Sequence, residues 1–327
     1  MLRADLGIFA HDEAQGIAAM VAQALVQREA CAAAGIDLRV LVLANGCRDD
    51  TAARAAAAGA EVADLPQGGK SRTWNRFTQD LSRPEAAILV FADADIAWTE
   101  PDALARLILG LSARPGLWVL NSRPVKDIAL TGARTLVEKL ALKAAGGLDD
   151  WKTAICGQLY AMPAARARAF RLPAGLPVED GFLRAMVLTD QLTIPEDLNR
   201  IDGLDGVFHL FESERSLKGL IRHQERIVIG SAVNACLFDR LRALPPDARA
   251  AALTQAAADE AWLGAQLRAG LPRWPFLYVP FHFLVKRLTR PGALRRLPVT
   301  LLGLGFDFIV YLRAQIRMAK GTGAGFW

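Results

Sequence analysis

Short apolar runs alternate with longer, Ala-rich segments over the first 120 residues of the chain. The runs have the length of β-strands, and the segments between them have the length and composition of helices. Strands that alternate with helices over short connections form parallel sheets with right-handed crossovers. The sequence therefore predicts an α/β fold, with strands at residues 6–10, 38–43, 61–63, 86–95 and 117–121 and helices at about 14–34, 51–58, 72–76 and 103–111.

The clearest run, residues 86–95, is continuously apolar until it ends in Asp93 and Asp95. Such a run is typical of a buried parallel strand, and ligands of open α/β sheets gather at the carboxyl ends of the strands. In an extended chain both carboxylates would face one space, which favours a hard divalent ion, Mg²⁺ or Mn²⁺, shared with a phosphate-bearing substrate. The alternative is that one aspartate caps the next helix, although residues 99–102 (TEPD) already supply a helix start.

Farther along, the pattern predicts a helix at 131–145, a strand at 156–162, a helix at 182–188 and a helical segment at 240–269. Glu179 and Asp180 stand just before the helix at 182–188. An aspartate at a helix start is also a good N-cap, so the pattern alone leaves open whether Asp180 caps the helix or carries chemistry.

Four segments, in this order and with matching intervals, resemble the nucleotide-sugar half of family 2 glycosyltransferases of the GT-A fold: FAHDE, VLANGCRDDTA, GGKSRTWNRF and VFADAD. Members of that family commonly read AHNEE, VVDNGSTDGT, GKGxALN and DADxxxxP over the same length. The resemblance covers about residues 5–230. It implies a Rossmann-like GT-A domain, and an inverting enzyme that uses a nucleoside-diphosphate sugar with Mg²⁺ or Mn²⁺.

The resemblance also implies roles for single residues. The donor base pocket would be formed by the backbone near Ala10 and His11 and by the side chain of Glu13, and the nucleoside would lie on Asn45 and Asp49. The sequence departs from the family at two positions, because Asp12 stands where the family often has Asn, and Asn45 where many members have Asp. These departures leave the identity of the base open.

Lys70 would approach the diphosphate or the base edge. Asp93 and Asp95 would hold the ribose and the metal, with Asp95 as the more direct ligand. His209 is the candidate for a third metal ligand, because some GT-A enzymes use a late histidine; a lone histidine in an apolar stretch is more often a hydrogen-bonded structural residue.

In the same family a Gly-containing strand and a following Glu-Asp pair hold the catalytic base, which here is Asp180 beside Glu179. Sugar transfer with inversion needs one carboxylate to take a proton from the acceptor hydroxyl while the metal steadies the leaving diphosphate. Gln224 and Arg226 are candidates for closing over the diphosphate; the alternative is a solvated basic helix face.

Two other nucleotide-binding motifs fit less well. The GGKS segment at 68–71 imitates a P-loop, but Asp64 stands where the first P-loop glycine is required, and its charge opposes phosphate binding. A dinucleotide-binding domain needs a GxGxxG segment after the opening strand, and residues 9–16 (FAHDEAQG) do not provide one.

The last 57 residues are basic and apolar. They hold nine Lys or Arg against Asp307 alone, so their net charge is +8, whereas the rest of the chain carries −3. Two apolar segments there, at 274–285 and 298–312, are shorter than the ~18 residues of a spanning helix and are flanked by basic residues. We expect them to lie in the interface of an anionic membrane, rather than to bind nucleic acid; the alternative is a helical pair packed on the body or in a dimer interface.

The expected organisation is a GT-A domain at 1–230, a helical bridge at 231–270 and a basic, membrane-associating tail at 271–327. The four cysteines show no CxxC pair or metal spacing, and the N-terminus has no signal-peptide core, so we expect a cytoplasmic chain attached peripherally to the cell membrane. The expected activity is sugar transfer from a nucleoside-diphosphate sugar to a lipid-linked or saccharide acceptor. Two alternatives are a non-catalytic nucleotide-sugar-binding domain, and nucleotidyl transfer, which would need a Gly-rich first loop.

Overall fold

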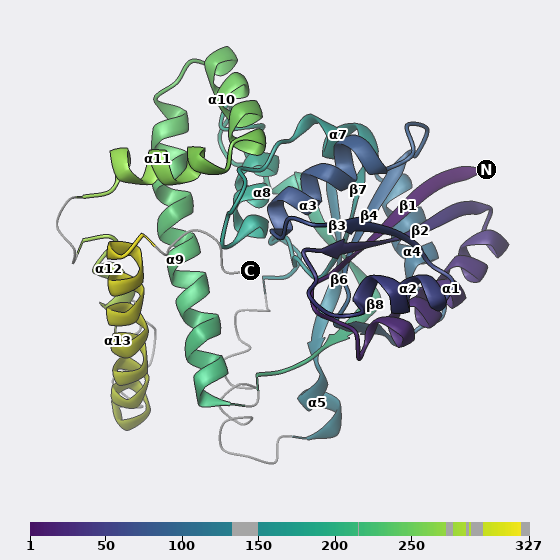
Figure 1. Cartoon of the computed structure of the whole chain (residues 1–327), viewed down its shortest axis with the longest axis horizontal. Coiled ribbons are helices and arrows are strands. Elements are labelled where there is room, and N and C mark those ends of the chain that lie inside the picture. The colour runs from purple at the N-terminus through teal and green to yellow at the C-terminus, as the bar shows by residue number, and fades with distance from the viewer. Residues whose placement is uncertain (133–149, 215, 273–276, 286–287, 289–296, 322–327) are drawn as a thin grey trace. The chain divides into compact units, whose positions relative to one another are not determined.

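The computed structural model describes residues 1–132, 150–214, 216–272, 277–285, 288 and 297–321 (Figure 1). They form two compact units: the first comprises Met1–Leu172 and Asp180–Ser213, and the second comprises Pro173–Glu179 and the chain from Glu214 onward. The units divide the chain elsewhere than at the predicted positions 230 and 270, because one helix, α9 (Leu217–Arg242), runs without a break through residue 230. Most of the helix predicted at 131–145 lies outside the described residues.

An eight-stranded sheet in the order β3-β2-β1-β4-β7-β6-β8-β5 organises the first unit. The pairings β3–β2, β2–β1, β1–β4 and β6–β8 are parallel, and β7 runs antiparallel to both of its neighbours. The strands are β1 (Leu2–Ala10), β2 (Ile36–Asn45), β3 (Glu61–Leu65), β4 (Ile88–Asp93), β5 (Ile96–Trp98), β6 (Val119–Lys126), β7 (Leu159–Pro163) and β8 (Ile201–Phe211). The predicted α/β class with a mostly parallel sheet is confirmed.

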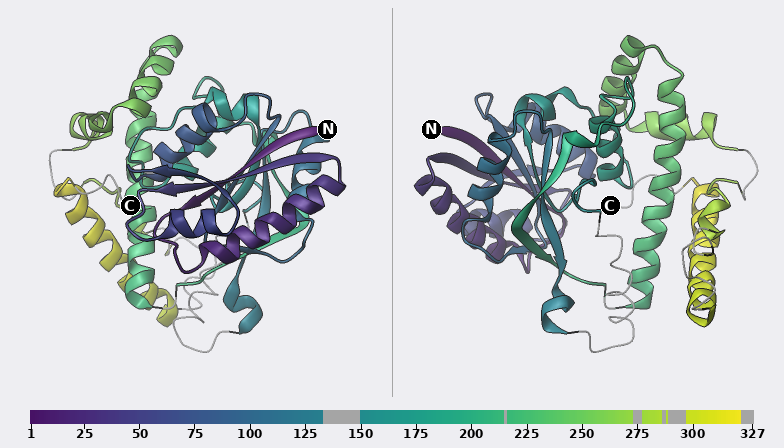
Figure 2. Two further views of the ribbon diagram at one scale, coloured as in Figure 1. Left: turned by 45° about the vertical axis from the view of Figure 1, so that its right-hand side comes forward. Right: turned by 180° about the vertical axis from the view of Figure 1, so that it is seen from behind.

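Helices cover both faces of this sheet (Figures 1 and 2). Alternate strand residues such as Ile8 and Val90 pack with α1 and α4. On the other face, Phe91 stacks on Trp74 of α3 and on Tyr160, its partner on β7. This two-sided burial explains why β4 is continuously apolar. The helices of this unit are α1 (Ile17–Ala33), α2 (Thr51–Ala57), α3 (Lys70–Arg76), α4 (Ala103–Ser112), α5 (Asp127–Thr131), α7 (Ala164–Ala169) and α8 (Glu179–Leu188), and a π-helical turn η1 (Phe77–Leu81) continues α3.

A buried ion network joins β1, β2 and the segment before β4. Asp5 of β1 is fully buried, and its carboxylate accepts hydrogen bonds from the backbone and Nε of Arg83 at 2.6 and 2.7 Å. The Arg83 guanidinium also reaches the Asp37 carboxylate at 2.7 Å and the Ala4 carbonyl at 2.9 Å. Arg39, the register partner of Asp5 on β2, lies 3.7 Å from the same carboxylate.

The second unit is helical. It contains α9, α10 (Pro246–Ala258), α11 (Glu260–Gly270), α12 (His282–Val285) and α13 (Leu297–Ala319). The segment at 240–269 is helical, as predicted, and it is divided between three helices. Two prolines at 245–246 follow the end of α9, since proline cannot continue a helix, and Asp259 accepts a capping bond from the Ala261 N–H at the start of α11. Among the described residues, no helix is long and apolar enough to cross a membrane.

Candidate functional site

Loops at the carboxyl ends of β1 and β2 are bonded to each other in the first unit. The His11 ring Nδ1 lies 2.7 Å from the Asn45 carbonyl oxygen. The Glu13 backbone N–H donates to Thr51 Oγ1 at 2.8 Å, and the Ala14 N–H donates to the Asp49 carboxylate at 3.1 Å. These bonds use the Asp49 side chain to fix the loop, so the structure gives it a positioning role; its predicted contact with a nucleoside stays a prediction.

Asn45 differs from its prediction, because its side chain is buried under the Gly-rich loop instead of facing a ligand space. It is 2% exposed, and its Oδ1 accepts hydrogen bonds from the Gly69 backbone and from Thr73 Oγ1, both at 2.8 Å. The amide therefore ties the end of β2 to the start of α3. This bond places Lys70, the first residue of α3, next to the end of β4.

Gly46 allows the loop after β2 to approach the Gly-rich loop at residues 67–69. Its φ of +61° is in the left-handed region, and a Cβ there would lie 2.6 Å from the Gly68 backbone. We expect Gly46→Ala to displace the loop before Lys70 and to cost more than ~2 kcal/mol of stability, because both the strained φ and the backbone clash must be relieved.

The matched control for Gly46→Ala is Gly35→Ala. Gly35 also has a left-handed φ, +78°, but a Cβ there meets nothing within 4 Å. Thermal unfolding of both variants separates the clash from the strain of the backbone. Equal losses of stability would contradict the close packing of the two loops.

Lys70 and Asp93 form the central ion pair of the site. Lys70 Nζ lies 2.6 and 2.9 Å from the two Asp93 carboxylate oxygens and donates to the Gly157 carbonyl at 3.2 Å. The Asp93 backbone N–H in turn donates to the Gln158 carbonyl at 2.9 Å. The residues at 157–158 thus lie against the end of β4, directly before β7.

The expectation that the chain stays extended through Asp95 is wrong. β4 ends at Asp93, and Ala94 and Asp95 form a turn that leads into β5. The Ala94 N–H donates to the Phe9 carbonyl at 3.0 Å, so pairing with β1 reaches Ala94 before the chain turns. Asp93 is half-buried and paired with Lys70, whereas Asp95 is exposed. The two carboxylates therefore have different surroundings.

Glu13 shows that the acidic side chains nevertheless gather at one place. Its pKa is raised from 4.5 to about 7, first by burial and then by the negative charges of Asp95, Asp49, Glu212 and Asp93, in that order. Four carboxylates from three segments thus act on Glu13. Hard oxygen donors with excess negative charge suit Mg²⁺ or Mn²⁺, so the chemistry of these side chains fits such an ion. Among the described residues, however, no three of these five carboxylates have ligand atoms within 4.8 Å of one another.

The raised pKa of Glu13 predicts a pH effect on stability. Between pH 4.5 and about 7 the native state holds a proton that the unfolded chain has lost, so stability falls as the pH rises through this window. Glu13→Gln should remove this fall. Since Glu13 is only partly buried, the gain at pH 8 should be roughly 1 kcal/mol, or about 2–4 °C in Tm, and close to zero at pH 4.5.

Glu85→Gln, at an exposed glutamate, is the control for Glu13→Gln. Mn²⁺ should shrink the Glu13→Gln difference at pH 8, because a nearby cation lowers the pKa of a carboxyl. A constant Tm difference from pH 4.5 to 8 would contradict the electrostatic account.

Asp180 joins the same cluster through Gly157. It is the second residue of α8, and its Oδ1 accepts a hydrogen bond from the Gly181 N–H at 2.7 Å. A Cβ on Gly157 would lie 3.2 Å from Asp180 Oδ2, so the carboxylate packs directly on this glycine. Burial, and then the Asp180 charge, raise the pKa of the neighbouring Cys156 thiol to about 12. Asp180 therefore lies on one side of Gly157, whose carbonyl binds Lys70.

Glu179, the other member of the predicted catalytic pair, is buried at 8% exposure. Ala10 is also buried, at 1%, and its carbonyl accepts a hydrogen bond from Cys47 Sγ at 3.4 Å. Gln224 and Arg226 lie in α9 of the second unit, so their predicted place over a diphosphate stays a prediction.

His209 does not join Asp93 and Asp95 in a metal-ligand group, contrary to the prediction. The ring is fully buried, with Nδ1 at 3.0 Å from Ser122 Oγ and Nε2 at 3.2 Å from Gln158 Oε1. Burial lowers its pKa to about 3, so the ring is neutral. In the described part of the chain, Asp12, Cys47 and Asp49 are the one group of three such residues whose ligand atoms lie within 4.8 Å of one another. His209 is a structural residue that holds Gln158 beside the site.

Three residues of the site were not predicted: Gly157, Gln158 and Glu212. Gly157 and Gln158 connect Asp93, Lys70 and Asp180 through backbone and packing contacts that residue types alone do not reveal. Glu212 left a weak signal, because it follows the last residue of β8 directly, as Asp93 ends β4.

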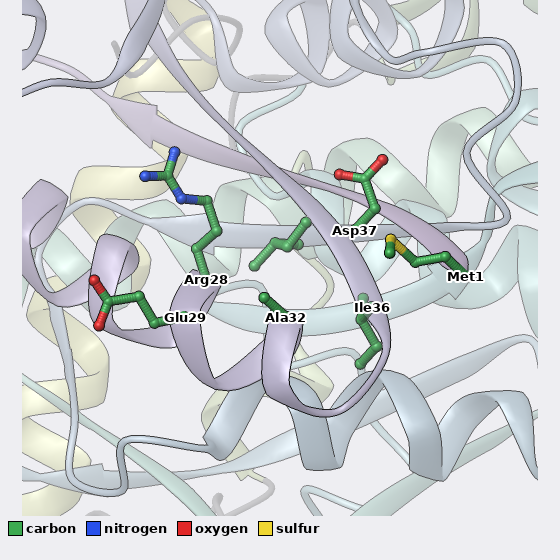
Figure 3. A pocket seen from close by; sticks show the side chains of 7 residues that line it. Met1, Arg28, Glu29, Ala32, Ile36 and Asp37 are labelled. Carbon is green, nitrogen blue, oxygen red and sulfur yellow. The ribbon is translucent and has the colours of Figure 1, made fainter.

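A separate hollow of about 300 Å³ lies at the other end of the first strands (Figure 3). It is lined by Met1, Ile36 and Leu38 together with Arg28, Glu29, Ala32 and Asp37. Leu2 pairs with Ile36 at the amino ends of β1 and β2, so this hollow is remote from the carboxyl-end site.

Solved structures share the fold at low sequence identity, whereas no family model and no curated protein matches the sequence. A mannosyl-3-phosphoglycerate synthase from Rubrobacter xylanophilus is 17% identical with a TM-score of 0.50, over 76% of this chain and 76% of that chain. A glucosyl-3-phosphoglycerate synthase from Mycobacterium tuberculosis, crystallised with Mn²⁺, UDP-glucose and phosphoglyceric acid, is 19% identical with a TM-score of 0.49, over 75% of this chain and 81% of that chain. The chain thus has the fold of the mannosyl-3-phosphoglycerate synthase, which confirms the predicted GT-A fold class.

Proposed function

We propose that the protein is a metal-dependent glycosyltransferase that moves a sugar from a nucleoside-diphosphate sugar to an acceptor hydroxyl with inversion. One observation carries the proposal: Gly157 lies between the Lys70–Asp93 pair at the end of β4 and the Asp180 carboxylate. A donor-binding group and a candidate base, held on different elements, therefore meet at the carboxyl ends of parallel strands. This is the place where open α/β sheets bind ligands.

The acidic residues of the site would bind the metal ion, and Lys70 would bind the diphosphate. Asp95, with Asp93, Glu13 and Asp49 nearby, would hold Mg²⁺ or Mn²⁺, whose bound charge would offset the negative charge of the leaving diphosphate. Lys70 is a cation that the chain itself supplies beside this cluster, and it would reach a diphosphate oxygen if its bond to Asp93 loosened. Its place at the first turn of α3 adds backbone N–H groups that favour an anion.

Asp180 would act as the general base. A carboxylate that accepts a proton from the acceptor hydroxyl raises the nucleophilicity of the oxygen as it attacks the anomeric carbon from the face opposite the diphosphate. The proton goes to Asp180, the new bond forms to the acceptor oxygen, and the bond to the diphosphate oxygen breaks. Its Oδ1 accepts a hydrogen bond from the Gly181 N–H at 2.7 Å, which fixes the carboxylate at the start of α8.

The neighbours support the donor class by analogy of fold only. The glucosyl-3-phosphoglycerate synthase binds UDP-glucose, Mn²⁺ and a small phosphorylated acceptor. A uracil base and a saccharide, lipid-linked or small anionic acceptor are therefore part of this proposal. Acceptor pockets are built by loops that vary on one scaffold, so the fold does not choose among them.

The test is a binding panel. Nucleoside diphosphates and their sugars are added with Mn²⁺, with Mg²⁺ or with EDTA to the wild type, to Asp95→Asn and to the control Asp247→Asn, an exposed aspartate on α10. A ligand at a hundred times its Kd should stabilise the protein by about 2.7 kcal/mol. Metal-dependent stabilisation by one diphosphate, lost in Asp95→Asn and kept in Asp247→Asn, is the expected result. No stabilisation by any of them would overturn the donor site. Binding without turnover would instead favour a non-catalytic nucleotide-sugar-binding domain.

A further inference from the structure

The second unit has an apolar helix face that points to solvent. α13 packs on α9 with one side, where Val310, Ala314 and Met318 are buried. On its other side seven apolar positions at helical spacing are exposed: Leu301, Leu302, Gly305, Phe308, Ile309, Leu312 and Ile316. Figure 1 and the right panel of Figure 2 show α13 alongside α9. We call these seven positions the outer face of α13.

The exposure of this face is high for such large side chains. Leu302 is 78% exposed, and Phe308 is 55% exposed. Leu277 and Phe281, in the segment around α12 that packs beside α13, are 60% and 66% exposed. Contiguous apolar surface of this kind is rare on soluble monomers and marks an interaction site.

The charged residues that border the outer face are positive. Consecutive helix residues are about 100° apart, so Asp307 and Ile309 lie on opposite sides of Phe308, and Asp307 falls outside the outer face. Arg313 and Lys320, both exposed, lie at its edge and its C-terminal end. No carboxylate therefore interrupts the apolar surface, whereas cations border it.

A buried ion cluster fixes this orientation of α13. Glu225 of α9 is fully buried, and its carboxylate oxygens lie 3.1 Å from Arg313 Nε and 2.8 Å from Arg317 Nε. Gln315 accepts hydrogen bonds from the Tyr278 and Val279 N–H groups and donates to the Val279 carbonyl. Because these bonds tie α13 to α9 and to the α12 segment, a rotation of α13 that would bury the outer face would break them.

We propose that the outer face of α13, together with Leu277 and Phe281, docks the protein on the surface of an anionic lipid bilayer. An interfacial helix buries an apolar face among the acyl chains and places basic residues at the headgroups. The chain from residue 271 onward carries a net charge of +8, which complements anionic lipid. None of the described helices is long and apolar enough to span a bilayer.

Docking to lipid does not rest on the proposed sugar transfer, because it needs no donor and no catalytic residue. If both proposals hold, docking through the outer face of α13 would favour a lipid-linked acceptor in the same membrane. Binding of vesicles and binding of nucleoside diphosphates are measured separately, so either proposal can fail alone.

The experiment is co-sedimentation of the full chain with vesicles of phosphatidylcholine, alone or mixed with phosphatidylglycerol. The variants are the double change Phe308→Ser with Leu312→Ser, and Lys320→Gln. The matched control is Leu109→Ser with Leu198→Ser, two leucines of the first unit that are 45% and 51% exposed. Because all changed side chains are exposed, circular dichroism should show unchanged helicity.

The wild type should sediment with the anionic vesicles and much less with phosphatidylcholine alone. The α13 double variant should lose at least about tenfold in partitioning, Lys320→Gln about fivefold on anionic vesicles, and the control double variant nothing. Equal binding by wild type and the α13 variant would overturn the proposal. So would a wild-type dimer in light scattering that the same variant converts to a monomer while lipid has no effect, because the outer face would then be an interface between two copies.

Discussion

Asp180→Asn should abolish sugar transfer while leaving the donor bound. The change removes the carboxylate that would take the acceptor proton, and general-base catalysis contributes about 10²–10⁴-fold, so kcat should fall by that factor. The amide oxygen can still accept from the Gly181 N–H, as Oδ1 does at 2.7 Å, so the start of α8 should be intact and Tm should change little. Steady-state turnover and the donor-induced thermal shift, measured on the same samples, check both parts.

The control for Asp180→Asn is Asp102→Asn. Asp102 also stands at the start of a helix, α4, and it is exposed and makes no capping bond through its side chain. It should keep full activity. If Asp180→Asn retained wild-type kcat, the carboxylate would be only a helix-start residue, and the base would have to be sought elsewhere. If instead donor binding were lost with activity, Asp180 would act on the donor and not on the acceptor.

Arg83→Met should destabilise the protein strongly. It removes the bond and the positive charge that the Arg83 side chain gives to the Asp5 carboxylate, which is fully buried on β1. That carboxylate keeps the bond from the backbone N–H of residue 83 at 2.6 Å and the more distant Arg39 at 3.7 Å. Removing one partner of a buried ion pair costs about 3–5 kcal/mol, because an uncompensated charge stays in the interior. Thermal and urea unfolding of the purified variant measure this loss.

Arg76→Met is the matched control, since it also removes an arginine from an ion pair. Arg76 lies 2.8 Å from Asp80, but both side chains are about half exposed, and exposed pairs contribute roughly 0–1 kcal/mol. The double change Asp5→Asn with Arg83→Met should recover part of the loss, because the buried charge is then gone. Equal effects of Arg83→Met and Arg76→Met would show that the buried network is not a stabilising feature of the sheet.

The sequence predicted the sheet better than the site. Strand β4 could be recognised because burial on both faces makes all of its residues apolar, a pattern that needs no knowledge of neighbours. The end of this strand at Asp93 could not be recognised, since the run of residues 86–95 has no proline or glycine that would mark a turn. The helical character of residues 240–269 could also be recognised, because it follows from their Ala- and Leu-rich composition.

Roles that depend on pairing were decided by the fold. Asn45 matched a nucleoside-contacting position in sequence, but the approach of the Gly-rich loop buries its amide. His209 is of a residue type that binds metals, but β8 places its ring between Ser122 and Gln158. Burial there lowers the pKa of the ring and keeps it neutral. The ion network around Asp5 could not be recognised in the sequence, because its partner Arg83 is 78 positions away in the chain.

The sequence by itself determined the α/β class, the order of the loops that carry Glu13, Lys70 and Asp93, and the basic, apolar character of the last 57 residues. These properties are local: they follow from the periodicity, composition and spacing of neighbouring residues. Only the tertiary structure decided that Gly157 brings Asp180 to the Lys70–Asp93 pair, and that α13 turns its apolar side outward. The reason is that both depend on contacts between segments far apart in the chain, which a linear pattern does not specify.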